Sequence, residues 1–349
     1  MNYKSIITTL TAVLFAACSQ DDTSLVQPGM QPSPSEAVPL EVTAALPGME
    51  VSGQTRASET MWDKGDDIGI FAVTAGMLYN PIAGGTNIHY RASQGEETQP
   101  ADTYYVPFAA YDSPIYLPTD GSAIDVYAYY PYIPTAQLTN PGAHPVDITD
   151  QATQSAIDFM VTGRTPTTTQ GGSTHISALN PSCELLFRHC FTKLQFNLAP
   201  GTGMTEDDIT GATGGNVTTL ALQTGLAFKT KGLLNLYTGD VAPLATDVGS
   251  AISPVEITPA VAWPGTGGYT TAKTFEAIIL PQAVPANMVT ITITGASTYA
   301  DYTFTIPATT YEPGKRYIYN IVVDPAQLTV TAAIEPWTIG ATYNGIEAE

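Results

Sequence analysis

The stretch VPLEVTAALPGMEVSGQTR, residues 38–56, begins as a strand and ends at an isolated arginine. Every second residue at its start is apolar, which is the period-2 pattern of a half-buried β-strand. Pro47-Gly48 ends that pattern, and a polar run then leads to Arg56, one of 12 basic residues among 349. A strand suited to burial is therefore followed by a flexible segment with a lone arginine. The residues on the predicted buried face are Val38, Leu40, Val42, Ala44 and Leu46.

Near the other end of the chain a second run alternates in the same way, so one strand could stand in for the other. This run comprises Leu328, Val330, Ala332 and Ile334. A later run alternates in the opposite parity and comprises Trp337, Ile339, Ala341 and Tyr343. The sequence alone does not choose between these two candidate donor strands, both of which fall within residues 327–349.

Composition predicts an all-β protein. Charged residues make up only 13% of the chain, and short alternating runs such as VTITIT at residues 289–294 are separated by Gly and Pro, which is typical of β-sandwiches. The length allows about two domains. The net charge of −20 and the pI near 4.3 repel phosphate backbones, so nucleic acid is excluded as a partner.

The amino terminus is predicted to be a targeting segment. Lys4 precedes an apolar run at residues 6–15 that is too short for a mature membrane-spanning helix. The run FAAC then resembles a bacterial lipobox, which implies cleavage before Cys18 and acylation of its thiol, for example with palmitate. An ordinary secretory signal is the alternative. We therefore expect a signal peptide at residues 1–17.

A tether is expected at residues 18–37. It begins with the run SQDD, which resembles the acidic tag that sends some lipoproteins to the outer face of the outer membrane. The rest is rich in Pro, Ser and Gln and has no apolar pattern. The expected location is therefore the cell surface.

A change of phase divides the remainder of the chain. In the stretch CELLFRHCFTKLQFNL, residues 183–198, the apolar positions shift from odd to even parity. Such a shift moves side chains to the opposite face of a sheet and predicts a bulge or a handover between two cores near residues 191–193. We therefore place a domain boundary here and expect sandwiches at residues 38–190 and 191–349. Cys183 and Cys190 are predicted to be buried free thiols, because a seven-residue separation within one strand is too long for a disulfide.

No constellation of residues predicts catalysis, a metal centre or a cofactor. The four histidines, at positions 89, 144, 175 and 189, have no metal-ligand spacing, and His189 is predicted to be structural. Asp66-Asp67 and Asp207-Asp208 are expected in turns, where weak Ca²⁺ binding is left open. No nucleophile, dinucleotide or phosphate motif occurs in a suitable context. The chain is therefore predicted not to be an enzyme.

A series of motifs in order along the chain resembles the fimbrillins, the pilus subunits derived from lipoproteins, and the fimbrillin-like proteins around them. The motifs are the lipobox cysteine, QTRA, WDKGDDIGIF, YAYYPY, LLFRHCFTKLQF, AIILPQ, EPGKRYIYNIVV and TVTAAIEPW. The resemblance covers nearly the whole chain and implies two tandem sandwiches of the transthyretin-like kind.

The resemblance also implies how the protein would work. An arginine-specific protease would cut the lipidated precursor between Arg56 and Ala57, the strand at residues 38–46 would leave, and the carboxy-terminal strand of another pilus subunit would replace it. The result would be a surface pilus, or fimbria, that supports adhesion to a host protein or glycan. The alternative is a surface glycan-binding lipoprotein of tandem sandwiches, with the tyrosines and Trp263 as stacking platforms.

Overall fold

The computed structural model describes residues 37–46, 62–95, 105–163, 165, 175–211, 219–264, 268–294, 301–325 and 327–337. Nearly all regular structure in these ranges is β, so the predicted fold class is confirmed. No described helix is long and apolar enough to cross a membrane.

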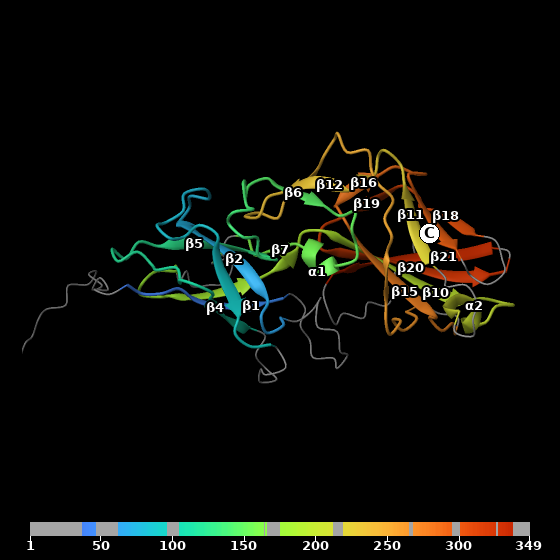
Figure 1. Ribbon diagram of the computed structural model, residues 1–349, viewed down its shortest axis with the longest axis horizontal. Helices are drawn as coiled ribbons and strands as arrows, with labels where there is room; N and C mark the ends of the chain where they lie inside the picture. The colour runs from blue at the N-terminus through green and yellow to red at the C-terminus, as the bar shows by residue number, and fades with distance from the viewer. Residues whose placement is uncertain are drawn as a thin grey trace, which may run out of the picture. The chain divides into compact units, whose positions relative to one another are not determined.

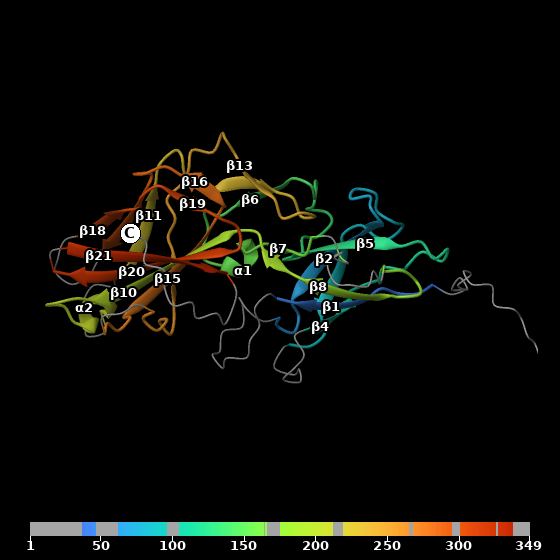
Figure 2. The ribbon, with the colours of Figure 1, turned by 180° about the vertical axis from the view of Figure 1, so that it is seen from behind.

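An eight-stranded sheet dominates the first half of the chain, in the order β8-β1-β4-β3-β2-β5-β7-β9. Figures 1 and 2 show β1 within this sheet, in blue. The central strand β2 is buried on both faces because its residues alternate between two hydrophobic clusters. The strands are β1 (Glu41–Ala45), β2 (Asp67–Thr74), β3 (Ile88–Ala92), β4 (Val106–Ala110), β5 (Ile124–Tyr130), β7 (Met160–Val161), β8 (Ser182–Leu186) and β9 (Arg188–His189).

A five-stranded sheet, in the order β14-β15-β10-β20-β21, dominates the second half. Its strands β10 and β20 are parallel and both pack apolar side chains into the larger hydrophobic cluster. β21 lies at the edge and pairs only with β20 among the described strands. The strands are β10 (Thr192–Pro200), β14 (Val255–Ile257), β15 (Lys273–Ile279), β20 (Lys315–Asp324) and β21 (Gln327–Pro336).

Smaller sheets complete the larger cluster. β11, β17 and β18 form one sheet, β13, β12 and β6 a second, and β16 and β19 a third. The VTITIT run forms β17 with its valine and isoleucines buried, as its alternation predicts. The bounds are β6 (His144–Asp147), β11 (Thr219–Thr224), β12 (Lys231–Leu234), β13 (Val241–Pro243), β16 (Gln282–Val284), β17 (Val289–Thr294), β18 (Tyr302–Thr305) and β19 (Thr309–Tyr311).

Two short helices interrupt the strands. α1 (Gln154–Ile157) precedes β7. α2 (Glu206–Thr210) is closed by a capping box between Thr205 and Asp208. The turn predicted for Asp207-Asp208 is therefore wrong, because these acidic residues lie in the first turn of α2, where carboxylates favour the positive end of the helix dipole.

The handover between two cores lies a few residues before the predicted place at residues 191–193. Cys183, Leu185 and Phe187 belong to the smaller cluster, whereas Cys190 and Phe191 belong to the larger one. Contacts group Pro34–Glu349 into one compact unit, and β6, from the range predicted for the first domain, pairs with β12. The boundary at residue 190 stays a prediction.

Candidate functional site

The strand β1 lies inside the eight-stranded sheet rather than at its edge. It pairs antiparallel with β4 and parallel with β8. Chain flanking the strand is bonded as well, because Leu40 N donates to Ile115 O at 2.8 Å and Leu117 N donates to Val38 O at 2.9 Å. Backbone groups on both sides of this segment are therefore satisfied by neighbours, and loss of the segment would leave them without partners.

The side chains of this strand follow the predicted alternation. Leu40, Val42, Ala44 and Leu46 are buried in the smaller hydrophobic cluster, and Val38 packs against it partly buried. The cluster also includes Trp62, the first described residue after the segment that holds Arg56. Trp62 packs edge-on against Phe108 and Phe187. The predicted removable strand therefore packs into the smaller hydrophobic cluster together with residues that follow the proposed cleavage site.

The cleavage and lipidation residues lie outside the described residues. These are Cys18, Arg56 and Ala57, together with Ile339, Ala341 and Tyr343 of the later donor candidate. Their predicted roles stay predictions.

The earlier donor candidate forms β21, and its apolar face is only partly covered. Leu328 and Val330 pack against the larger cluster, partly buried. Ala332 is exposed, and Ile334 is 62% exposed. An edge strand with an exposed isoleucine is the kind of surface that soluble proteins usually protect. Trp337, in contrast, is only 4% exposed and belongs to the larger cluster.

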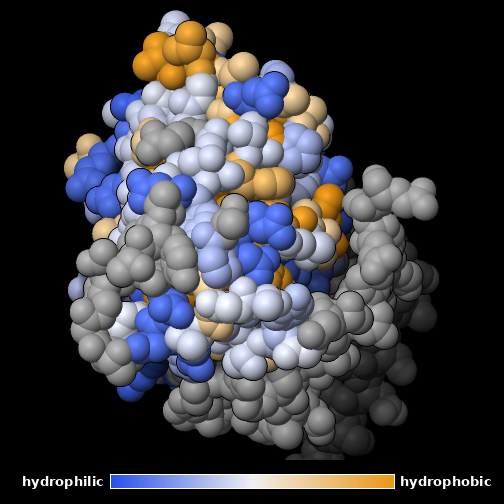
Figure 3. Space-filling model, turned by 90° about the vertical axis from the view of Figure 1, so that its right-hand side faces the viewer, coloured by the Kyte–Doolittle hydropathy of each residue, from blue (hydrophilic) through white to orange (hydrophobic). Residues whose placement is uncertain are grey.

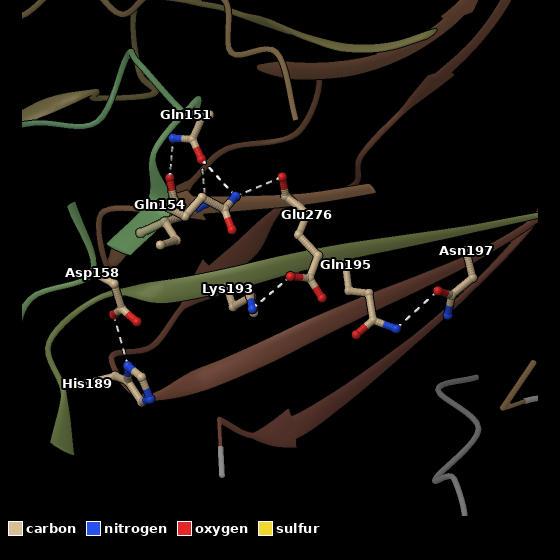
Figure 4. Close-up of polar contacts among 9 residues, drawn as sticks. Gln151, Gln154, Asp158, His189, Lys193, Gln195, Asn197 and Glu276 are labelled. Carbon is tan, nitrogen blue, oxygen red and sulfur yellow. Dashed lines mark hydrogen bonds and ion pairs between the residues drawn. The ribbon is translucent and has the colours of Figure 1, made fainter. Parts of the chain in front are cut away.

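A buried polar cluster lies beside Trp337, and no sequence motif predicted it. His189 Nδ1 lies 2.9 Å from Asp158 Oδ1, and Lys193 Nζ lies 2.8 Å from Glu276 Oε2. Figure 4 shows both pairs below a glutamine network. All four side chains are buried, so pairing offsets the cost of removing these polar and charged groups from water. The structural role predicted for His189 agrees with these contacts.

The glutamine network of Figure 4 extends the edge of β15. Gln151 Nε2 donates to Ile278 O at 2.9 Å, while Ile278 N donates to Gln151 Oε1 at 2.8 Å. Gln154 Nε2 donates to Glu276 O at 3.0 Å. These amides take the place of a neighbouring strand, satisfying backbone groups that would otherwise be buried without partners.

The two remaining cysteines are free and buried, as predicted. Burial raises the pKa of Cys190 to about 12 and also raises the pKa of Cys183. Both therefore remain protonated and unreactive while their surroundings stay closed.

The Asp66-Asp67 pair is committed to structural contacts. Asp67 accepts hydrogen bonds of 2.7 Å from Arg91 Nε and Nη2, and His89 Nε2 lies 2.7 Å from the same carboxylate. Asp66 lies in the turn before β2, and burial raises its pKa to about 6. Among the described residues, no group of three or more His, Cys, Asp or Glu side chains could hold a metal ion.

The candidate glycan platforms are mostly occupied by packing. Tyr127 and Tyr129 of the YAYYPY run are buried, and Tyr132 stacks on His89 with ring centroids 4.0 Å apart. Trp263 is partly buried beside Tyr269. The face in Figure 3 is mostly hydrophilic or intermediate, with hydrophobic side chains in small separate patches. These tyrosines are therefore mainly core and rim residues.

Known proteins provide an independent comparison. The model of the fimbrillin-like family matches residues 55–337. The chain belongs to the fimbrillin-like family. This family consists of structural fimbrial subunits, which supports the prediction that the chain is not an enzyme. Fimbrial subunits assemble with other subunits at the cell surface. Membership of the family therefore places this fimbrillin-like chain in a fimbria at the cell surface, in contact with other subunits.

Relatives of this fimbrillin-like chain agree over nearly its full length. A Bacteroides uniformis protein named "Putative fimbrium subunit Fim1C" is 28% identical over 340 residues, covering 95% of this chain and 93% of that protein. A solved "putative cell adhesion protein" from Bacteroides uniformis has a TM-score of 0.62 at 24% identity, covering 88% of this chain and 100% of the other. A fimbrial protein from Bacteroides vulgatus has a TM-score of 0.50 at 14% identity, with 86% and 100% covered. At these identities the solved structures support the fold alone.

Proposed function

We propose that the protein is a subunit of a surface pilus that polymerises by donor-strand exchange. The chain is exported as a lipoprotein through Cys18 and cut between Arg56 and Ala57. The strand at residues 38–46 then leaves, and a carboxy-terminal strand of a neighbouring subunit takes its place. Residues 18–37 tether the precursor to the outer membrane until the cut is made.

The position of β1 is the observation that carries this proposal. It lies between β4 and β8, so its departure would leave a gap with unpaired backbone groups on both sides. Such a gap accepts one added strand in a defined register, which is the basis of β-strand addition. A strand at the edge of the sheet would leave only one open side.

The buried side chains supply the driving force for replacement. Leu40, Val42 and Leu46 contribute about 1.5–3 kcal/mol each when buried. Ordering an incoming strand and losing its free motion oppose this gain. Because several apolar positions and two rows of hydrogen bonds are restored together, we expect the exchanged strand to be held firmly.

Donor and acceptor surfaces differ, so this contact repeats head to tail and gives a filament wherever the rotation between successive subunits does not close into a ring. In the filament we expect the exposed aromatic side chains to be available for adhesion to a host protein or glycan. Tyr79, Tyr111 and Tyr116 are among those that are about half exposed or more.

The decisive experiment compares processing and polymerisation in the Arg56→Ala, Arg56→Lys and Lys64→Ala variants. An arginine-specific protease should cut the native chain so that amino-terminal sequencing reads Ala57, and filaments should follow by electron microscopy. Arg56→Ala should remain monomeric with the arginine-specific protease. Arg56→Lys should resist the arginine-specific protease and be rescued by trypsin.

Lys64→Ala is the matched control, because Lys64 is an exposed basic residue shortly after the proposed cut. This variant should be processed and should polymerise like the native chain. If Arg56→Ala loses residues 38–46 and forms filaments at the native rate, the proposal is wrong.

A further inference from the structure

A shallow hollow lies beside β3 and β4 of the eight-stranded sheet. It has a volume of about 510 Å³, and Lys64, Arg91 and Tyr111 are among the residues that line it. Tyr90 of β3 is buried in the smaller hydrophobic cluster. Because side chains on a strand point to opposite faces in turn, its neighbours His89 and Arg91 point away from that cluster. The hollow therefore forms where these outward side chains meet Tyr111.

Tyr111 has a fixed ring that still presents surface to solvent. Its ring stacks on the His89 imidazole with centroids 4.4 Å apart and an interplanar angle of 24°. His89 stacks in turn on Tyr132 at 4.0 Å and 4°, and the backbone N of Tyr111 donates to His89 O at 2.9 Å. Even so, Tyr111 is 54% exposed. Unlike the buried tyrosines of the YAYYPY run, it can therefore serve as a rigid platform.

Arg91 and Asp67 hold polar groups in place beside this platform. Asp67 accepts hydrogen bonds of 2.7 Å from Arg91 Nε and Nη2, a bidentate contact that fixes the direction of the guanidinium. Arg91 Cζ lies 4.4 Å from the centroid of the Tyr111 ring, and the Arg91 side chain is still 42% exposed. These groups are oriented before any ligand arrives, which lowers the cost of binding one.

Small residues leave room for a ligand in the hollow. Ala109 lies opposite Arg91 in the β3–β4 pair, and residues opposite each other in an antiparallel pair share a face. Gly65 and Ala110 also line the hollow. A concave surface with one aromatic ring, small residues and a few oriented polar groups has the composition of a ligand site.

Charges of both signs surround the hollow. Lys64 and Arg91 line it, while Asp66 precedes β2 and Asp67 pairs with Arg91. The whole chain carries a net charge of −20, which repels an anionic ligand, and the two basic side chains in the hollow repel a cationic one. A polar but uncharged ligand therefore suits this surface best.

We propose that the hollow binds a neutral sugar of a surface glycan, with the sugar ring lying on Tyr111 and its hydroxyl groups bonded to Arg91 and Lys64. Sugar rings suit these groups because their C–H faces pack on aromatic rings, while each hydroxyl group can both donate and accept. This inference rests on the adhesive part of the proposed function and does not depend on strand exchange. It names one ligand class and one site for that adhesion.

The test probes the uncut full-length chain with an array of neutral oligosaccharides that end in galactose, mannose or N-acetylglucosamine. Sialylated and sulfated counterparts are included. The native chain should bind neutral members, and added salt should leave this binding unchanged because no ligand charge is screened. Tyr111→Ala should weaken binding by about tenfold or more. Tyr111→Phe keeps the ring and should keep most of the binding.

Two further variants separate the site from a general surface effect. Arg91→Lys keeps the positive charge but loses the bidentate contact with Asp67, so it should also weaken binding. Leu186→Ala is the matched control, because Leu186 is 53% exposed and lies in β8 of the same sheet, outside the hollow. It should bind like the native chain. Thermal unfolding of each variant shows whether it is folded when binding is measured.

The outcomes that overturn the site are distinct from a failure of strand exchange. If the native chain binds no neutral oligosaccharide, or if folded Tyr111→Ala binds as well as Leu186→Ala, the hollow is not a glycan site. Binding confined to sialylated or sulfated members would overturn the neutral class. Strand exchange is read separately, from filaments after the arginine cut, so a chain that forms none can still be tested for glycan binding.

Discussion

Cys183 of β8 lies opposite Val42 of β1 in a parallel strand pair, and both side chains are buried in the same hydrophobic cluster. The thiol is therefore covered in part by the strand that we propose to be removable. Cys190 lies in the other cluster. The two thiols can report separately on the two cores.

The first prediction uses this difference. After the cut at Arg56, at protein concentrations too low for polymerisation, Cys183 should become reactive toward a maleimide, while Cys190 should stay unreactive. Burial raises the pKa of both thiols in the closed chain, so both should be unreactive before the cut. Mass spectrometry of the labelled peptides gives the two rates, with Cys183→Ser as the control. Equal labelling of both thiols would indicate general unfolding instead of strand release.

The second prediction concerns the buried ion pair between Lys193 and Glu276. Glu276→Gln should lower the free energy of unfolding by about 3–5 kcal/mol, because it leaves a buried ammonium without its opposite charge. Urea denaturation measures the change. Lys231→Ala, which breaks the half-exposed pair with Asp147, should cost less than about 1 kcal/mol. Similar losses in the two variants would contradict the role of burial.

The third prediction concerns Gly69, which pairs with Tyr129 in β2 and β5. A Cβ atom at residue 69 would lie 2.2 Å from Tyr129 Cε1, closer than real side chains approach. The ring cannot move away freely, because the Tyr129 hydroxyl donates to Asn87 Oδ1 at 2.6 Å. Gly69→Ala should therefore destabilise the fold by about 1–3 kcal/mol through overpacking.

Thermal unfolding checks this prediction, with Gly142→Ala as the control. A Cβ atom at residue 142 would make only ordinary contacts, at 3.5 Å or more. The control variant should unfold close to the native temperature, and an unchanged midpoint for Gly69→Ala would contradict the packing argument.

The fourth prediction is a pH dependence that comes from Asp66. Burial raises its pKa from 3.8 to about 6, and the nearby Asp63 and Asp67 carboxylates add to the rise. Between about pH 4 and 6 the folded chain therefore holds a proton that the unfolded chain has released. The contribution of Asp66 should make the free energy of unfolding fall as the pH rises through this window, and Asp66→Asn should remove that slope.

Asp120 serves as a control because its pKa is shifted in the opposite direction to that of Asp66. Hydrogen bonds from Ser122 lower the pKa of its carboxyl group, so its contribution to stability is present above its ordinary pKa and is lost as the pH falls. Asp120→Asn should leave the slope between pH 4 and 6 attributed to Asp66 in place. Urea denaturation at several pH values measures all three chains, and a slope that survives in Asp66→Asn would assign it to another group.

Much of the fold follows from local patterns in the sequence. Alternation predicts the buried faces of β1 and β17, because side chains on a strand point to opposite sides in turn. The parity change in residues 183–198 predicts a passage from one core to another near residues 191–193, and the structure places it slightly earlier, between Phe187 and Cys190. These features depend only on residues close together in the chain.

Features that depend on distant residues could not be predicted in this way. The pairing of β6 with β12 joins short segments far apart in the sequence. The contact of Gln151 with Ile278 replaces a strand by an amide, and no periodicity marks such a residue. Trp337 reads as one member of an alternating donor run, and only the positions of His189 and Lys193 place it in the core.

The place of β1 between an antiparallel and a parallel neighbour has a mechanical consequence. A replacement strand in this gap, pulled along its own length in a filament, loads the hydrogen bonds on both of its sides in shear, so that many must break together. β21 pairs with β20 alone among the described strands, and a pull on its carboxy-terminal end would break the hydrogen bonds of this pair one at a time. Trp337 directly follows that end and is buried in the larger cluster, so its packing must be lost before the strand pair can open from this side.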